Sequence, residues 1–213
     1  MTVGRDGKQT DMGEQDTYDV VASETPYQGR FISLVVDDVR MSDGSVARRE
    51  YIKHPGAVVI VALDDEGHVV LVNQYRHPVR ARVDELPAGL LDVPGESALD
   101  AAKRELEEET RLAADEWNVL VDLHSSPGCS SEAARVFLAR GLTAIETDFE
   151  PEAEELTLTV TREPLAEAVR RVLAGSVTNS AAVAGILAAV HGRATGWRDL
   201  RPADAPWPAR PRI

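Results

Sequence analysis

The sequence has one cysteine, no excess of positive charge and no long hydrophobic run. Cys129 alone cannot form an internal disulfide, so we expect a protein of a reducing compartment such as the cytoplasm. No apolar run reaches the roughly 18 residues that a membrane helix needs, and the polar N-terminus lacks the apolar core of a signal peptide. The formal net charge of -13 disfavours nucleic acid and anionic membranes as partners, because no basic patch is present to bind phosphates.

What the sequence does have is a group of glutamates within residues 85–112. Residues 97–110 favour a helix of about four turns, with no internal Gly or Pro. In such a helix Glu105, Glu108 and Glu109 share one face, because spacings of three and four residues stack side chains above one another. Each like-charged pair destabilises an isolated helix by roughly 0.2–0.5 kcal/mol, so we expect a bound cation. Ligands that are all oxygen favour Mg²⁺ or Mn²⁺ over zinc; the alternative is a solvated acidic face without metal.

The same segment resembles the Nudix box, in which a glycine, five residues, a glutamate and seven residues precede REUxEExGU, where U is apolar. Glu96, seven residues and RELEEETRL at 104–112 fit this pattern closely. The chain departs from it twice: six residues separate Gly89 from Glu96, and Arg111 takes the place of the final glycine. That place often needs the left-handed backbone conformation, which costs a residue other than glycine on the order of 1 kcal/mol.

The chain is identified as a member of the Nudix family, hydrolases that cleave nucleoside diphosphates linked to another moiety. This resemblance implies an α/β fold, a Nudix α/β/α sandwich, here with a small N-terminal antiparallel β-sheet. Flanking segments are similar to the ADP-ribose pyrophosphatase branch: QYRHP at 74–78, ELPAG at 85–89, Pro127 at 15 residues beyond Leu112, and the stretches 29–31, 37–40, 49–50 and 54–57.

Membership of this branch implies metal-dependent hydrolysis of ADP-ribose to AMP and ribose 5-phosphate, in a homodimer whose N-terminal sheets exchange between chains. Two alternatives stay open. One is a Nudix hydrolase of another nucleoside diphosphate derivative, such as a nucleotide sugar, NADH or an oxidised nucleotide. The other is a non-catalytic domain that senses ADP-ribose.

The resemblance also assigns roles at the acidic helix. It implies that Glu105, Glu109 and the backbone carbonyl of Ala88 bind the metal, and that Glu108 is a further ligand or a supporting catalytic group. Arg104 is expected to pair with Glu96 or with a glutamate of the metal face and so to orient it. An exposed helical ion pair is the alternative for Arg104.

The general base is expected on a later loop, where several glutamates precede an apolar run at 156–160. Registering the alternation of that run against the strand that follows this loop in the family selects Glu154, with Glu152 as second choice. A mobile acidic loop without a catalytic role is the alternative.

Substrate contacts are expected from three residues outside the box. Arg76 is the candidate for binding a phosphate or the terminal ribose region, because a guanidinium binds phosphate oxygens in a fork. In this branch the adenine commonly stacks on an aromatic residue near the dimer junction, and Tyr27 and Phe31 are the candidates here. Packing in the core is the alternative for Phe31.

The pattern of apolar runs and turn residues predicts four segments. They are a disordered lead at 1–16, a small sheet for dimerisation at 17–55, a Nudix hydrolase domain at 56–193 and a Pro/Arg-rich tail at 194–213, loosely ordered unless it docks. The expected elements are strands at 30–39 and 46–52 around a turn at 42–44, a hairpin of 57–63 and 68–75, strands at 117–123, 133–139 and 156–160, and helices at 164–174 and 179–191.

Overall fold

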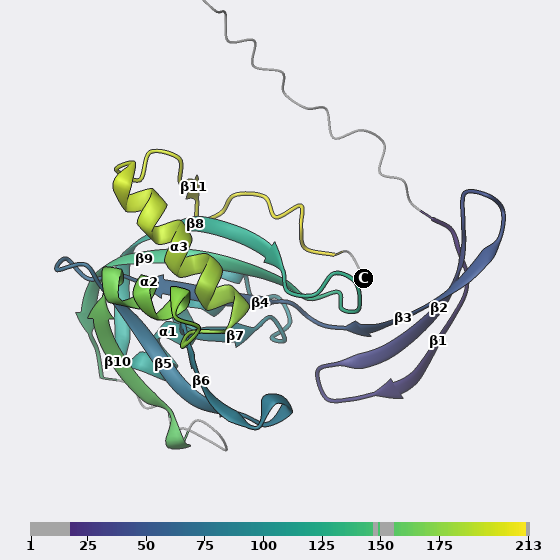
Figure 1. The fold of residues 1–213 in the computed structure, drawn as a ribbon, viewed down its shortest axis with the longest axis horizontal. Helices are drawn as coiled ribbons and strands as arrows, with labels where there is room; N and C mark the ends of the chain where they lie inside the picture. The colour runs from purple at the N-terminus through teal and green to yellow at the C-terminus, as the bar shows by residue number, and fades with distance from the viewer. Residues whose placement is uncertain (1–17, 147–148, 150–155, 212–213) are drawn as a thin grey trace, which may run out of the picture.

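The computed structural model describes residues 18–146, 149 and 156–211. Figure 1 shows an N-terminal sheet that stands away from a body of helices and two further sheets. The N-terminal sheet is antiparallel, in the order β1 (Val20–Gln28), β2 (Ser33–Arg40), β3 (Val46–Lys53). The predicted turn between β2 and β3 is confirmed, with Gly44 at φ 85°. The sequence did not single out β1, because all of its residues are exposed and carry no apolar alternation.

The central sheet has five strands in the order β11-β8-β9-β4-β7. These strands are β4 (Ala57–Ala62), β7 (Ala88–Leu90), β8 (Leu112–His124), β9 (Ala133–Ala144) and β11 (Arg201–Pro202). β4 runs parallel to β9, and the other neighbours are antiparallel. Val58 and Ile60 of β4 pack in the core that includes Leu106, whereas Val61 packs in the core that includes Ile186. The sheet therefore buries both faces, as the predicted α/β/α sandwich requires.

The helices are α1 (Ala98–Thr110), α2 (Leu165–Leu173) and α3 (Ser180–Ala194), close to the expected ranges. Ser97 caps α1, since its hydroxyl accepts a hydrogen bond from the N–H of Asp100 at 3.1 Å. Arg111 ends α1 with φ 57° and ψ 38°, so the predicted left-handed conformation is confirmed at this residue. Within the described part of the chain, no helix is long and apolar enough to cross a membrane.

The predicted hairpin of 57–63 and 68–75 is wrong in its pairing. β5 (His68–Arg76) leaves β4 after a single bridge between Leu63 and Val69 and joins a third sheet, in which it lies between β10 (Thr159–Pro164) and β6. The physical reason is that β4 already pairs with β7 on one edge and β9 on the other, so neither edge is free for β5. β6 spans Ala81–Glu85.

The predicted strand at 156–160 is also wrong in its position. The strand of this region, β10, is Thr159–Pro164 and pairs with β5. Leu156 is 69% exposed and Val160 is 42% exposed, so the alternation of apolar residues does not point into the core. The choice of Glu154 depended on this alternation, so it loses that support. Glu154 and Glu152 themselves lie outside the described residues.

The tail docks on the body. β11 pairs with β8, and the buried Arg135 donates hydrogen bonds to the carbonyl oxygens of Ala205 at 2.7 Å and Pro206 at 2.9 Å. Asp122 holds the guanidinium of Arg135 in turn, at 2.8 Å. A proline-rich segment without helix or long strand is thus fixed by a buried cation that needs its carbonyl oxygens.

Candidate active site

An open cavity of about 400 Å³, called here the main cavity, lies where β4, β7, the end of β5 and the start of α3 meet. Its lining includes Phe31, His54, Arg76, Glu85, Ala88, Gly89 and Asn179. The carboxylate face of α1 lies next to this cavity. Helix α1 packs against β7, and Ala88 and Gly89 of β7 line the cavity.

Two glutamates of α1 contact β7 directly. The N–H of Ala88 donates a hydrogen bond to Oε2 of Glu109 at 3.0 Å. A Cβ at Gly89 would overlap the carboxyl group of Glu105. The Ala88–Gly89 backbone and the two carboxylates therefore pack against one another, and the structure brings together Ala88, Glu105 and Glu109, the residues expected to bind metal.

Arg104 connects the carboxylates of this region. Its guanidinium binds Glu96 in a fork, with Nε to Oε1 at 2.9 Å and Nη2 to Oε2 at 3.0 Å, so the predicted pair with Glu96 is confirmed. Nη1 donates to Glu105 at 2.7 Å and to Glu108 at 3.0 Å. These contacts, led by the hydrogen bonds to Glu96, hold the pKa of Arg104 above its usual range. Arg104 is thus no isolated surface pair but orients three carboxylates.

The carboxylates have the chemistry that a hard divalent cation requires. The pKa of Glu109 is raised from the usual 4.5 to about 8, mainly by burial; the charges of Glu105 and Glu85 contribute to this increase, and the Ala88 N–H and Arg76 oppose it. A carboxylate in such surroundings is costly to ionise without a compensating cation. Glu105, Glu108 and Glu109 and the carbonyl of Ala88 offer only oxygen atoms, so this donor set fits Mg²⁺ or Mn²⁺.

A separate group of potential ligands, Asp64, Glu66 and His68, lies at the turn between β4 and β5. Oδ1 of Asp64 accepts a hydrogen bond from the N–H of His68 at 2.7 Å, and the ring of His68 lies 3.3 Å from the same oxygen. These contacts close the turn, and none of the three residues lines the main cavity. The turn geometry is sufficient to explain this group.

Arg76 lines the main cavity, as a substrate-binding residue should, and an ion pair fixes its side chain. Its guanidinium pairs with the buried Glu85, the shortest distance being 2.6 Å from Nη2 to Oε2. Asn179 donates its side-chain amide to Oε1 of Glu85 at 3.1 Å, while its Oδ1 accepts the N–H of Ala182 at 2.9 Å and caps α3. One asparagine therefore ties the start of α3 to the carboxylate that orients Arg76.

The sequence reasoning missed Asn179 and His54 as cavity residues. Asn179 carried a usable signal, because an asparagine at the first position of a predicted helix is a common N-cap. Its second contact, with Glu85, has no local signal. His54 appeared only as part of a branch motif.

The aromatic candidates differ in placement. Phe31 is 50% exposed and lines the main cavity, so the alternative of core packing is wrong for this residue. Tyr27 is 60% exposed on β1 and does not line the main cavity. Glu108 and Glu109 line another cavity, of about 240 Å³, together with Phe149 and Leu158, which lie before and after Glu152 and Glu154 in the sequence.

Comparisons with known proteins agree with this geometry. Residues 53–175 match the family model described as NUDIX domain, and residues 15–52 match the one described as nucleoside diphosphate sugar hydrolase N-terminal domain. The chain is 48% identical over 202 residues to the ADP-ribose pyrophosphatase of Mycobacterium tuberculosis, which covers 94% of this chain and 95% of that protein.

Two further similarities are more distant. The chain is 39% identical over 135 residues to the ADP-ribose pyrophosphatase of Bacillus subtilis, covering 63% of this chain and 72% of that protein. A crystal structure of an ADP compounds hydrolase matches with a TM-score of 0.68 at 27% identity, covering 85% of this chain and 96% of that chain.

Proposed function

Because the chain belongs to the Nudix family of hydrolases, we propose that it cleaves the pyrophosphate bond of ADP-ribose to AMP and ribose 5-phosphate. The names of the relatives from M. tuberculosis and B. subtilis support ADP-ribose as the substrate. The observation that carries the proposal is the carboxylate face of α1 beside a cavity that Arg76 lines. A pyrophosphate needs both: carboxylates to hold a divalent cation, and a guanidinium to bind its oxygens.

In this proposal Glu105, Glu109 and the carbonyl of Ala88 hold Mg²⁺ or Mn²⁺, with Glu108 as a further ligand. The bound cation would neutralise phosphate oxygens and stabilise the charge that develops on the leaving phosphate. Arg104 acts through the carboxylates, because its fork to Glu96 and its contacts to Glu105 and Glu108 restrict their rotation.

On the substrate side, Arg76 binds a phosphate of the pyrophosphate, held in place by Glu85. Glu154 removes the proton from the attacking water, with Glu152 as the second choice. The cavity shared by Glu108, Glu109, Phe149 and Leu158 supports a base between positions 149 and 158 of the sequence, since Phe149 and Leu158 lie beside Glu108 and Glu109.

We further propose a cytoplasmic homodimer that forms through the N-terminal sheet. This sheet stands away from the body and exposes Val20, Val21, Tyr27 and Val46, which a second chain would cover (Figure 1). In that assembly Phe31, and Tyr27 from the exposed sheet, are the candidates for stacking on the adenine.

The test is analysis of products after incubation of the purified protein with ADP-ribose and Mg²⁺, with nucleotide sugars, NADH and 8-oxo-dGTP in parallel. We expect AMP and ribose 5-phosphate from ADP-ribose, and their loss in Glu109→Gln. Turnover of another compound without turnover of ADP-ribose would leave the Nudix chemistry and overturn the substrate. Binding of ADP-ribose without any turnover would favour the sensor.

A further inference from the structure

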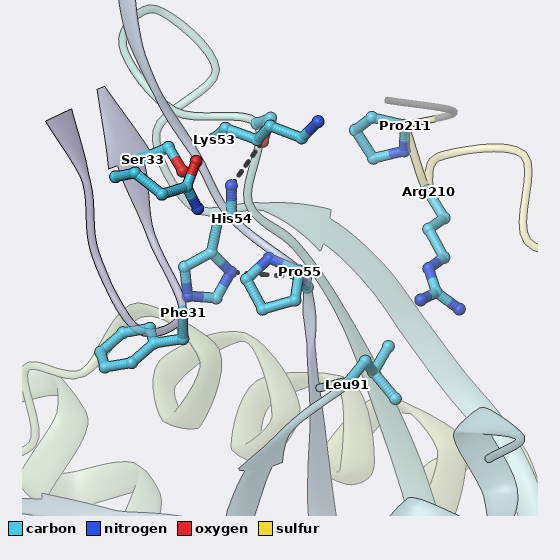
Figure 2. A pocket seen from close by; sticks show the side chains of 11 residues that line it. Phe31, Ser33, Lys53, His54, Pro55, Leu91, Arg210 and Pro211 are labelled. Atoms are coloured by element: carbon cyan, nitrogen blue, oxygen red, sulfur yellow. Dashed lines mark hydrogen bonds between the residues drawn. The ribbon is translucent and has the colours of Figure 1, made fainter. Parts of the chain in front are cut away.

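A third cavity, of about 300 Å³, lies between the end of β3, the start of β4 and the C-terminal segment 201–211, called here the strap. Figure 2 shows its lining, which includes Phe31, Lys53, His54, Leu91 and Arg210. We call it the strap cavity. Phe31 and His54 line the main cavity as well, so the two cavities adjoin at these two side chains.

A series of contacts between the strap and the body of the protein places Arg210 at this cavity. The buried guanidinium of Arg135 lies 4.8 Å from the ring centroid of Trp207, and the guanidinium of Arg210 lies 5.8 Å from the same ring. His124 Nε2 lies 2.8 Å from the carbonyl oxygen of Ala209. The residues next to Arg210 are therefore anchored to β8 and β9, and the arginine has a defined position at the cavity.

The charge of the strap cavity is opposite to that of the protein. The chain carries -13 overall, yet among the described residues that line this cavity none is acidic, and Lys53 and Arg210 bring two positive charges. Neither cation forms an ion pair within residues 18–146, 149 and 156–211. Figure 2 shows the Lys53 side chain extending towards the end of the strap, which carries Arg210 and Pro211. Such a local excess attracts an anion.

His54 adds a hydrogen-bond donor at the boundary of the two cavities. Its Nδ1 accepts the N–H of Gly56 at 3.1 Å, and its own backbone N–H donates to Ser131 Oγ at 2.9 Å (Figure 2). Burial lowers the pKa of His54, against the opposing charge of Glu132, so the ring is neutral at physiological pH. With Nδ1 as acceptor, the neutral ring carries its proton on Nε2 and presents N–H to a ligand.

We propose that the strap cavity is a subsite for a phosphomonoester dianion, contacted by Lys53 and Arg210. Because it adjoins the main cavity, its ligand is the phosphomonoester of a substrate whose pyrophosphate occupies the main cavity. The enzyme would then accept nucleoside diphosphate derivatives that bear an additional phosphate, such as ADP-ribose 2′-phosphate. This inference rests on the proposed function. Free phosphate has the same chemistry and is the other source of the ligand.

The first experiment compares kcat/KM for ADP-ribose 2′-phosphate and for ADP-ribose, with Mg²⁺ present. In the wild-type enzyme we expect the phosphorylated substrate to be used at least as well. In Lys53→Met and Arg210→Met the ratio of the two values should fall about tenfold, the effect of one lost charged hydrogen bond. Arg210→Lys should restore most of the ratio. Arg170→Met, which removes an exposed charge on α2, is the matched control and should keep the wild-type ratio.

The second experiment measures binding of inorganic phosphate by calorimetry to the same variants. Phosphate binding that depends on Lys53 and Arg210, with an unchanged substrate ratio, would assign the subsite to free phosphate. If neither the ratio nor phosphate binding depends on these residues, the subsite is overturned. Failure of the proposed function is distinct: the wild-type enzyme would hydrolyse neither nucleotide, while the calorimetry would still test the subsite.

Discussion

Gly89 and Glu105 are in direct contact: the carboxyl group of Glu105 lies where the Cβ of any other residue at position 89 would be. A side chain at this glycine of the Nudix box would therefore displace the Glu105 carboxylate from its position. The close approach places an expected metal ligand against the backbone of β7, whose Ala88 carbonyl is another.

Gly89→Ala should therefore abolish most of the activity, because the added methyl group must displace the Glu105 carboxylate. We expect kcat to fall by about two orders of magnitude, in the range of other displaced catalytic groups. Steady-state kinetics with ADP-ribose measures this. Gly128→Ala is the matched control, since a Cβ there meets nothing within 4 Å. If Gly89→Ala has the kcat of the wild type, catalysis does not depend on the position of the Glu105 carboxylate.

Arg111→Gly should stabilise the protein. Arg111 adopts φ 57°, and relief of the left-handed strain is worth about 1 kcal/mol, which we expect as an increase in the free energy of unfolding in urea. Lys103→Gly, at an exposed position inside α1, should instead lower that free energy by about 1 kcal/mol. A lower stability of Arg111→Gly would mean that contacts of the Arg111 side chain outweigh its backbone strain.

The stability of the cation-free protein should fall as the pH rises. Burial raises the pKa of Glu109 to about 8, above its value in the unfolded chain, so its contribution is complete below the usual 4.5 and is lost as the pH rises to about 8. Thermal unfolding in EDTA between about pH 5 and about pH 8 measures this. Glu109→Gln should flatten the dependence, and Mg²⁺ should stabilise the wild-type protein most at the alkaline end. An equal slope in Glu109→Gln would assign the dependence to other groups.

Asn179 should act in both stability and substrate binding, and two substitutions separate the roles. Asn179→Ser keeps a capping oxygen but loses the donor to Glu85, so we expect near-normal thermal stability with KM about fivefold higher. Asn179→Ala loses both contacts and should also lower the free energy of unfolding by about 1 kcal/mol. If Asn179→Ser binds substrate as the wild type does, Asn179 is a helix cap alone.

Glu154→Gln should lower kcat by about two orders of magnitude with KM nearly unchanged, as loss of a general base predicts. Rapid-quench or steady-state kinetics with ADP-ribose measures it, and Glu152→Gln is the matched comparison. Near-normal turnover of Glu154→Gln together with an inactive Glu152→Gln would move the base to Glu152.

Much of the acidic helix was predictable from the sequence. Its length, the shared face of the glutamates and the left-handed Arg111 all depend on residues a few positions apart, and helix geometry fixes such relations. The strand at 156–160 failed because alternation identifies a buried face only in a strand that has one, and β10 is largely exposed.

The sequence by itself determined the family and the carboxylate face, because both depend on short spacings along one helix. Only the tertiary structure decided that β5 leaves β4, since that depends on which strands already occupy the edges of β4. The tertiary structure also joined Asn179 to Glu85, 94 positions apart, and fixed the strap over Arg135. Such contacts form because buried charges and amides need partners, and the nearest partner in space is unrelated to the nearest in sequence.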